Sequence, residues 1–153
     1  IPDLEKNLTH PLWYMRSGAL NALSMVEKDR GLARAKSLLK NDPALLVRAS
    51  ALQVVAQQSA VDSKYLWTEL YNPLNFDNGY SLSIRKSIIK ILSKAPHKKE
   101  APKFIALIRD KDPDVRSIAI SALENLSKKK SPSSPVQDSV VSYWQGWYDK
   151  ANF

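Results

Sequence analysis

The sequence contains no cysteine, only two histidines and only four glycines. The lack of cysteine excludes disulfides, thiolate metal ligands and cysteine nucleophiles. His10 and His97 form no His-x-x-His or His-Glu-x-x-His motif, and no glycine-rich phosphate loop occurs, so no metal and no cofactor is expected. Four glycines are also too few for the turns of an all-β fold.

Long hydrophobic runs are missing as well. No stretch approaches the roughly 18 consecutive apolar residues of a membrane span, so we expect a soluble protein. The chain begins Ile1-Pro2-Asp3 rather than with methionine, and we expect that a signal peptide or further protein has been removed upstream. A cytoplasmic location and a periplasmic or secreted one both stay open, because a cysteine-free chain suits either redox environment.

The charge of the chain is unbalanced. Its 153 residues include 23 lysines and arginines against 15 acidic residues, a formal net charge of +8. Such an excess favours acidic partners or nucleic acid, and it also simply keeps a protein soluble. The length suits a single domain over residues 1–153.

The sequence does contain an internal repeat. Four segments align on arginines that are 32, 37 and 31 residues apart, namely Arg16, Arg48, Arg85 and Arg116. In every segment the third, fourth, sixth and seventh residues after the arginine are apolar, as is the residue before it. This pattern is the stripe of an amphipathic helix with one buried face. A period of this size is typical of stacked helix pairs.

Shorter apolar runs precede the arginine helices at residues 32–39, 65–71 and 101–108, and residues 4–8 indicate a short first helix. The sequence therefore predicts an all-α chain of about four helix pairs, with repeats at about 1–28, 31–59, 63–96 and 99–129. Asp42-Pro43 and Asp112-Pro113 are expected to end one helix and cap the next with proline in its first turn. Pro11 is expected to do the same for the first arginine helix, and Pro102 lies in the opening turn of 101–108.

Two of the segments resemble a known repeat family. Asp42-Pro43-Ala-Leu-Leu-Val47-Arg48-Ala-Ser-Ala51-Leu52 and Asp112-Pro113-Asp-Val115-Arg116-Ser-Ile-Ala119-Ile120 resemble the Asp-Pro, Val-Arg and Ala-Leu signature of HEAT and PBS-lyase-type HEAT repeats. The resemblance spans about residues 10–128. It implies an α-α superhelix, a HEAT-like solenoid whose second helices line a concave face and whose arginines and aspartates form an internal ladder. The first repeat departs with His10-Pro11, and the third with Gly79-Tyr80.

A capping helix is predicted at about residues 134–151, after the break at Ser131-Pro-Ser-Ser-Pro135. Ser134 is expected to be its N-cap, with Gln137 completing a capping box. Its apolar side is formed by Val136, Val140, Val141, Trp144, Trp147 and Tyr148. Solenoids need such terminal caps. The Tyr143 to Tyr148 cluster would also suit an aromatic ligand box or a dimer contact.

The longer spacing of 37 residues locates an insertion at 72–80, a loop with Asn78-Gly79 turn chemistry and two aromatic residues, Phe76 and Tyr80. Insertions in repeat proteins collect on one face, often the binding face. Phe76 would equally well fold under the loop and cover its own repeat.

The candidate binding face lies opposite the buried stripe. The fifth residue after each arginine is polar, giving Asn21, Gln53, Lys90 and Ser121, joined by Ser17, Ser50, Lys86 and Ser117. Uncharged hydrogen-bonding side chains suit an extended peptide, although any exposed helix face is polar. The sequence therefore predicts a non-catalytic protein–protein interaction or scaffold module that binds a partner protein or peptide on its concave face.

Two alternatives stay open. The first is nucleic-acid binding through lysines near helix ends, where cations also interact with the helix dipole. These lysines are Lys36, Lys40, Lys98, Lys99, Lys128, Lys129 and Lys130. The second is a domain of a larger or oligomeric assembly. An enzyme is disfavoured: one HEAT-like family consists of DNA glycosylases, but no catalytic aspartate in an aromatic pocket is matched, and capping explains Asp110, Asp112 and Asp114.

Overall fold

The computed structural model describes residues 1–153 and confirms the predicted all-α helical-repeat fold. The α-helices are α1 (Pro2–Asn7), α2 (Trp13–Val26), α3 (Lys28–Asn41), α4 (Leu45–Ala56), α5 (Ser63–Leu70), α6 (Ser83–Lys94), α7 (Ala101–Ala106), α8 (Pro113–Ser127) and α9 (Gln137–Lys150). The short elements are the 3-10 turns η1 (Pro73–Asn75), η2 (Lys98–Glu100) and η3 (Leu107–Arg109) and the strands β1 (Phe76–Asp77) and β2 (Tyr80–Ser81). None of the helices combines the length and the apolar character that a membrane crossing requires.

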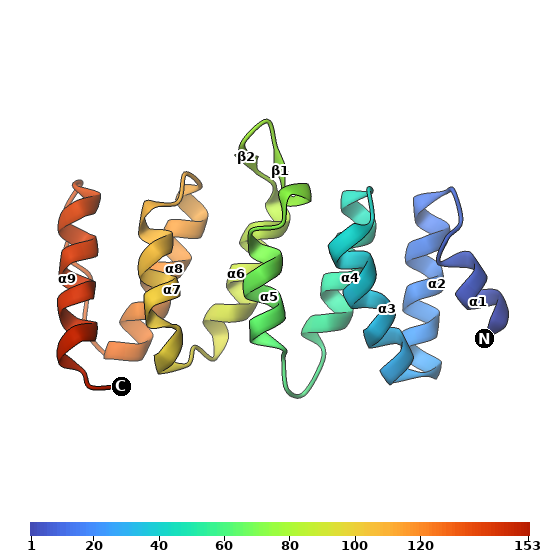
Figure 1. Cartoon of the computed structure of the whole chain (residues 1–153), viewed down its shortest axis with the longest axis horizontal. Coiled ribbons are helices and arrows are strands. Elements are labelled where there is room, and N and C mark those ends of the chain that lie inside the picture. Colours follow the sequence, from blue (N-terminus) through green and yellow to red (C-terminus); the bar gives the residue numbers. More distant parts are fainter. The chain divides into compact units, whose positions relative to one another are not determined.

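The chain forms two compact units, which we call unit 1 (Ile1–Asp77) and unit 2 (Asn78–Phe153). In unit 1, the helices α2, α3 and α4 pack on one another, and α1 packs on α2 (Figure 1). In unit 2, α6 and α7 pack on α8, while α9 packs on α7 and η3. The single domain over residues 1–153 stays a prediction.

The core of each unit consists of the predicted apolar stripes. The third residue after each arginine is buried in all four segments, at Ala19, Ala51, Ile88 and Ala119. The residue before the arginine is buried in the last three segments, but Met15 is partly exposed. Met15 differs because the six-residue α1 in front of it buries none of its own side chains.

The arginine side chains form the ladder that the family resemblance implies. Arg16 donates to both carboxylate oxygens of Asp42, at 2.8 and 2.9 Å, and Arg85 donates to both oxygens of Asp110, at 3.1 and 2.9 Å. Three of the arginines also donate from Nη1 to the backbone carbonyl six residues earlier, at His10 (2.7 Å), Asp42 (2.8 Å) and Asp110 (2.8 Å). Arg16 and Arg85 thus tie the start of their own helices to the aspartate that precedes the next second helix, whereas Arg116 bonds only to the segment before its own helix.

Arg48 has no carboxylate partner, because Gly79 stands six residues before Arg85, at the position where the second and fourth repeats have Asp42 and Asp110. Its guanidinium instead donates to Asn75 Oδ1 at 3.3 Å and to the Leu74 carbonyl at 2.6 Å. Burial therefore lowers the pKa of Arg48, against a smaller opposing effect of the charge of Asp42. By contrast, the hydrogen bond to Asp42 raises the pKa of Arg16.

The helix starts are only partly as predicted. Asp112 caps α8, accepting the Asp114 N–H at 2.9 Å with Pro113 as the first helical residue, and Pro102 lies in the first turn of α7. The predicted proline starts at Pro11 and Pro43 are wrong.

At these two sites the helices begin two residues later, at Trp13 and Leu45. The reason is a local turn before each helix, because His10 Nδ1 accepts the Leu12 N–H and Asp42 Oδ1 accepts the Ala44 N–H.

The predicted N-cap of α9 at Ser134 is also wrong. The Ser134 hydroxyl accepts the Val136 N–H at 3.2 Å, a turn that competes with helix, so α9 begins at Gln137 and Val136 is exposed. The rest of the stripe packs as a cap: Val140 and Trp144 are buried, and Trp144 Nε1 donates to Ser131 Oγ at 3.1 Å.

The insertion contains a small β-hairpin, which the sequence indicated only as a loop. β1 and β2 pair as a two-stranded sheet, and both turn residues have positive φ, 50° at Asn78 and 81° at Gly79. This is the backbone that a two-residue type I′ turn requires, and Asn-Gly is its preferred sequence. Phe76 is half-buried, whereas Tyr80 is 79% exposed.

The buried pair between Arg85 and Asp110 makes a pH-dependent prediction. Burial alone would raise the pKa of Asp110, but hydrogen bonds from Arg85 and the Asp112 N–H, together with nearby arginine charges, lower it. The pair therefore stabilises unit 2 fully above the unfolded aspartate pKa of about 3.9, and the stabilisation is lost as the pH falls through the lower folded value.

We expect Asp110→Asn to lower the free energy of unfolding by about 3 kcal/mol at pH 7, because Arg85 is only 1% exposed and would lose its counter-charge. Urea unfolding followed by circular dichroism should show this difference shrinking below about pH 4. The exposed Asp77→Asn is the control. A difference that does not change between pH 7 and pH 3 would contradict the assignment.

The ladder also predicts that a carboxylate is not tolerated at Asn75. Asn75 Oδ1 accepts from Arg48, while Asn75 Nδ2 donates to the Glu69 carbonyl at 2.8 Å. Asn75→Asp would place a carboxylate oxygen against that carbonyl, so we expect a loss of about 1–3 kcal/mol despite the added counter-charge. Thermal unfolding against the exposed Asn125→Asp measures it, and a stabilised variant would show that the charge of Arg48 dominates.

Candidate functional site

The second helix of each pair carries a stripe of outward-facing residues. Its positions can be counted from the arginine of that helix, and we call this count the arginine register. The stripe consists of the residues at −2, +2, +5 and +9 from the arginine, a spacing that keeps them on one helix face. In unit 1 these are Tyr14, Gly18, Asn21 and Met25 on α2, and Leu46, Ser50, Gln53 and Gln57 on α4. In unit 2 they are Ser83, Ser87, Lys90 and Lys94 on α6, and Asp114, Ile118, Ser121 and Asn125 on α8. All are exposed except Ser50 and Ile118, which are half-buried.

Within each unit the two stripes lie side by side. In unit 1, Ser17 Oγ lies 3.1 Å from Ser50 Oγ, which joins the outward sides of α2 and α4. In unit 2, Lys86 Nζ lies 3.4 Å from Asp114 Oδ2, which joins those of α6 and α8. We call the α2–α4 surface the neutral face and the α6–α8 surface the basic face.

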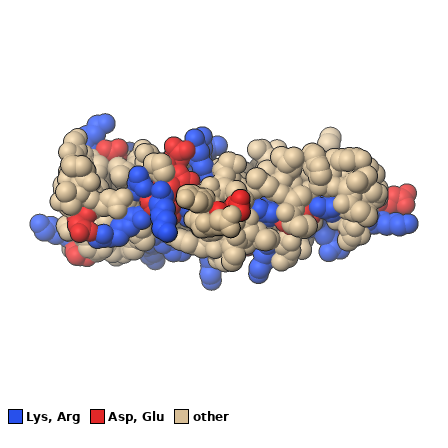
Figure 2. Space-filling view, turned by 90° about the horizontal axis from the view of Figure 1, so that it is seen from above, with Lys and Arg blue, Asp and Glu red and all other residues tan.

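Helices α2 and α4 contribute no free charge to the neutral face. The only charged residues of α2 and α4 are Arg16 and Arg48, and both belong to the ladder. Three apolar side chains of the stripes are nevertheless strongly exposed: Tyr14 at 54%, Leu46 at 55% and Met25 at 84%. In the space-filling view, the right-hand end, which is unit 1, shows mostly uncharged atoms (Figure 2). Interface cores have this composition, poor in charge and rich in aromatic residues and methionine.

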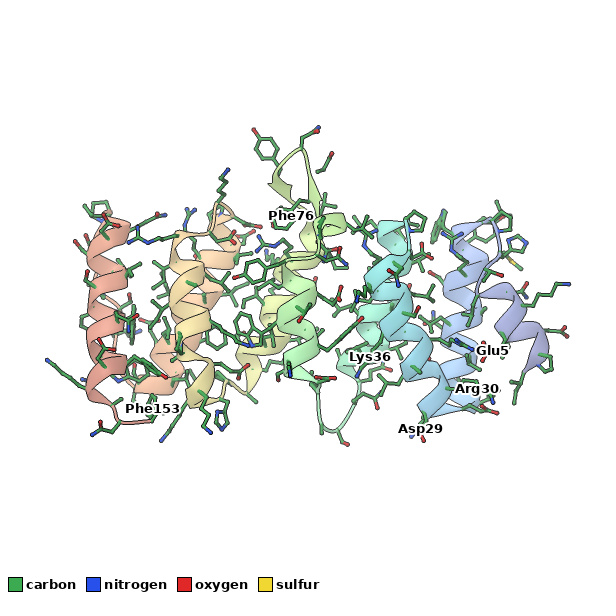
Figure 3. The ribbon with its side chains drawn as sticks, in the orientation of Figure 1. Glu5, Asp29, Arg30, Lys36, Phe76 and Phe153 are labelled. Carbon is green, nitrogen blue, oxygen red and sulfur yellow. The ribbon has the colours of Figure 1, made fainter.

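The charge of unit 1 is concentrated on α3 instead. That helix carries Lys28, Asp29, Arg30, Arg34, Lys36 and Lys40. Some of these charges are paired, since Glu5 of α1 lies 3.6 Å from Arg30 and 2.9 Å from Arg34 (Figure 3). The neutral character of α2 and α4 is therefore a property of that face and not of the unit as a whole.

Gly18 lies in the middle of the neutral face, four residues after Tyr14 and three before Asn21. Its φ is not positive, and a Cβ added there would meet nothing within 4 Å, so neither the backbone nor the packing of the unit requires glycine. A glycine inside a helix costs about 0.5–1 kcal/mol relative to alanine. Gly31 of α3 is the opposite case, because its Cβ would lie 2.5 Å from the Ser24 backbone of α2.

The basic face carries lysines at every fourth residue of α6: Lys86, Lys90 and Lys94. This spacing places them in one line along the helix. On α8, Ser117, Ser121 and Asn125 follow the same spacing, with Asp114 at the start. The residues predicted from sequence therefore divide between the units, Asn21 and Gln53 on the neutral face and Lys86, Lys90 and Ser121 on the basic face.

A pocket of about 760 Å³ opens beside the basic face, entirely within unit 2. Three segments line it: the hairpin, the start of α6 and the turn before α8. The lining residues are Asn78, Gly79, Tyr80, Ser81, Ser83, Lys86, Lys111, Asp112, Pro113 and Asp114. Tyr80 and Lys86, which the sequence indicated separately as insertion-loop and face residues, thus lie at one pocket. Phe76 does not line it.

The lysines predicted for nucleic-acid contact have varied surroundings. Lys36 pairs with Asp62 at 2.8 Å and lies over the Tyr65 ring, and Lys98 lies over the Phe153 ring (Figure 3). The others, Lys40, Lys99, Lys128, Lys129 and Lys130, are exposed.

Both histidines have structural partners. His10 Nδ1 accepts the Leu12 N–H, and His97 forms a capping box with Glu100 at η2. No group of three or more histidine, aspartate or glutamate side chains is placed to hold a metal ion.

Sequence reasoning missed four residues of these surfaces: Tyr14, Met25, Leu46 and Lys111. Counted from the arginine, Tyr14 and Leu46 lie at −2 and Met25 lies at +9, so extending the pattern in both directions along the helix locates them. Lys111 comes to the pocket only because the hairpin folds over the turn before α8, and no spacing in the sequence indicates that.

Comparison with known proteins identifies one segment. The protein-family model described as HEAT repeat matches residues 101–129, which comprise α7, η3 and α8. No curated protein and no solved structure matches the chain. The matched segment contains the Asp112-Pro113 and Val115-Arg116 motifs on which the resemblance is based.

Gly18 and Gly31 are expected to respond in opposite directions to the same change. Gly18→Ala should raise the free energy of unfolding by about 0.5–1 kcal/mol, because the methyl group enters open space. Gly31→Ala should lower it by about 1–3 kcal/mol, because α2 and α3 would have to move apart. Urea unfolding of the two variants tests this, and a destabilised Gly18→Ala would show that the fold needs this glycine.

Proposed function

We propose that this HEAT-repeat protein is a non-catalytic interaction module that binds a partner protein through the outward faces of its second helices. HEAT repeats generally mediate protein–protein interaction, and the family is typically non-enzymatic. The partner and the surface are our inference. The proposal is supported chiefly by one observation, the uncharged neutral face with its exposed aromatic and aliphatic side chains.

The composition of the neutral face suits a partner segment that is itself apolar and uncharged. Tyr14 and Leu46 occupy equivalent positions at the starts of α2 and α4, 32 residues apart in the register. Exposed side chains of this type become anchors when a partner covers them. Asn21 and Gln53 lie two turns further along and offer both donors and acceptors to backbone groups of an extended peptide.

Gly18 fits the same interpretation. Since the fold of unit 1 gains nothing from glycine here, the missing side chain is explained by a partner backbone that approaches α2 closely. The expected trade-off is that Gly18→Ala stabilises the free protein and weakens the complex. Such opposite effects on stability and function are common at binding surfaces.

Nucleic-acid binding is less well supported by the same observations. Phosphate contacts require free cations grouped on one surface and give steep salt dependence. The lysine line of α6 is one such group, but α2 and α4 contribute no free cation to the neutral face. Three of the seven lysines proposed for such contacts, Lys36, Lys98 and Lys128, have partners within the protein.

The test combines affinity capture from the source lysate with matched variants. We expect proteins retained by the wild type to be lost or reduced at least about tenfold by Tyr14→Ala combined with Leu46→Ala, since buried anchors of this kind cost more than 1 kcal/mol each. Gly18→Ala should weaken retention of the same proteins. Quantitative mass spectrometry of the retained fractions measures both effects.

The control is Leu74→Ala, which removes another exposed leucine of unit 1 outside the neutral face and should leave retention unchanged. Each variant is checked for wild-type circular dichroism and unfolding. Equal recovery of every retained protein by the wild type and the double variant would refute the neutral face as the binding surface.

A further inference from the structure

The pocket of unit 2 has hydrogen-bond donors on several sides. Lys86 and Lys111 contribute ammonium groups, and Tyr80 and Ser81 contribute hydroxyls. Ser81 Oγ lies 3.2 Å from Arg85 Nη1 and accepts a hydrogen bond from it. Because a hydroxyl has a single hydrogen, accepting from the arginine leaves that hydrogen available to donate elsewhere. Arg85 is itself fixed by its two hydrogen bonds to the Asp110 carboxylate, so the position of the Ser81 hydroxyl is fixed as well.

The acidic residues of the pocket are not equivalent. The Asp112 carboxylate already has a structural role, since it accepts the Asp114 N–H at the start of α8. Asp114 has one ionic contact, to Lys86 at 3.4 Å, and both side chains are well exposed, at 61% and 41%. Exposed ion pairs of this kind contribute little to stability, so Asp114 is a weak internal partner that another carboxylate can replace.

The lysine line of α6 leads away from this pocket. Residues four apart on a helix are displaced by about 6 Å along its axis, so Lys86, Lys90 and Lys94 repeat at that interval. In an extended peptide, side chains on one side repeat every second residue, or about 6.7 Å. A peptide with acidic residues at alternate positions therefore matches the lysine line in both charge and spacing.

We propose that the hairpin pocket and the lysine line of α6 bind an acidic, extended segment of the partner protein, with one carboxylate entering the pocket between Lys86 and Lys111. Tyr80, the first residue of β2 after the type I′ turn, covers that residue from the hairpin side. This inference rests on the proposed function and adds the chemistry of the partner over unit 2, since the neutral face of unit 1 suits an uncharged segment.

The probe is an acetylated and amidated pentapeptide, Glu-Thr-Glu-Thr-Glu, titrated into the ¹⁵N-labelled full-length chain at low salt. We expect saturable chemical-shift changes at the backbone amides of residues 79–81, 86–94, 111, 112 and 114. The uncharged peptide Gln-Thr-Gln-Thr-Gln should leave these amides unchanged at equal concentration. Since contacts between charges are screened by salt, the affinity should fall as salt is added.

Two sets of variants give opposite expected changes. Lys86→Gln combined with Lys111→Gln should weaken peptide binding by at least about tenfold, because two charge-assisted contacts are lost. Asp114→Asn should tighten it severalfold, because it frees Lys86 and removes a competing carboxylate. The matched control, Lys99→Gln combined with Lys129→Gln, removes the same charge from exposed lysines outside the pocket and should leave binding within about twofold, since long-range attraction is screened.

Three results would overturn the inference: unchanged binding in Lys86→Gln with Lys111→Gln, weaker binding in Asp114→Asn, or shift changes centred on residues 128–130. Stronger binding of a short oligothymidylate at the same amides would assign the pocket to nucleic acid instead. Because the probe reports on unit 2 alone, these results are independent of the capture experiment on Tyr14 and Leu46. Either proposal can therefore fail while the other holds.

Discussion

The hydrogen-bonded arginine near the start of each second helix, buried at Arg48 and Arg85 and half-buried at Arg16 and Arg116, is the feature on which the rest of the structure depends. Removing a guanidinium from water costs free energy unless its N–H donors form hydrogen bonds, and here the guanidinium forms them on two sides. One side binds the carbonyl six residues earlier, and the other binds an acceptor just before the next second helix. The arginine therefore holds the segment before its helix against that helix, and with the apolar stripe it sets how the helix is rotated. The outward stripes follow from that rotation.

The insertion in the third repeat shows what happens when the acceptor is changed. Asn75 replaces the aspartate and has two tasks, accepting from Arg48 and donating to the Glu69 carbonyl. A neutral amide serves both, whereas a carboxylate serves only one. The same insertion folds into the hairpin whose Tyr80 and Ser81 line the pocket of unit 2. The departure from the repeat that leaves Arg48 without a counter-charge is thus also the source of the most distinctive surface feature of the chain.

The sequence predicted the helices and the polar positions well, because both follow from one arginine register and the helical period. It predicted helix starts poorly at Pro11, Pro43 and Ser134. There, side chains bind nearby N–H groups and delay the helix, a competition that spacing does not reveal. Tyr14, Leu46 and Met25 were overlooked because an apolar residue in a repeat helix is ordinarily interpreted as core. The pocket required the pairing of two strands of only two residues each, which is too short a signal for periodicity to detect.

The difference between the two faces has a consequence for how a partner would bind. Charged surfaces mainly accelerate the first encounter, and their effect falls with salt, whereas desolvated apolar anchors mainly slow dissociation. The lysine line of α6 is a charged surface of the kind that accelerates encounter. Tyr14 and Leu46 are apolar side chains of the kind that slows dissociation once a partner covers them. Repeat units built on the same ladder can diverge in this way because the arginine and the apolar stripe hold the fold while most of the outward positions stay exposed. Gly18 is the clearest case, because it lowers the stability of its helix and neither the backbone nor the packing requires glycine there.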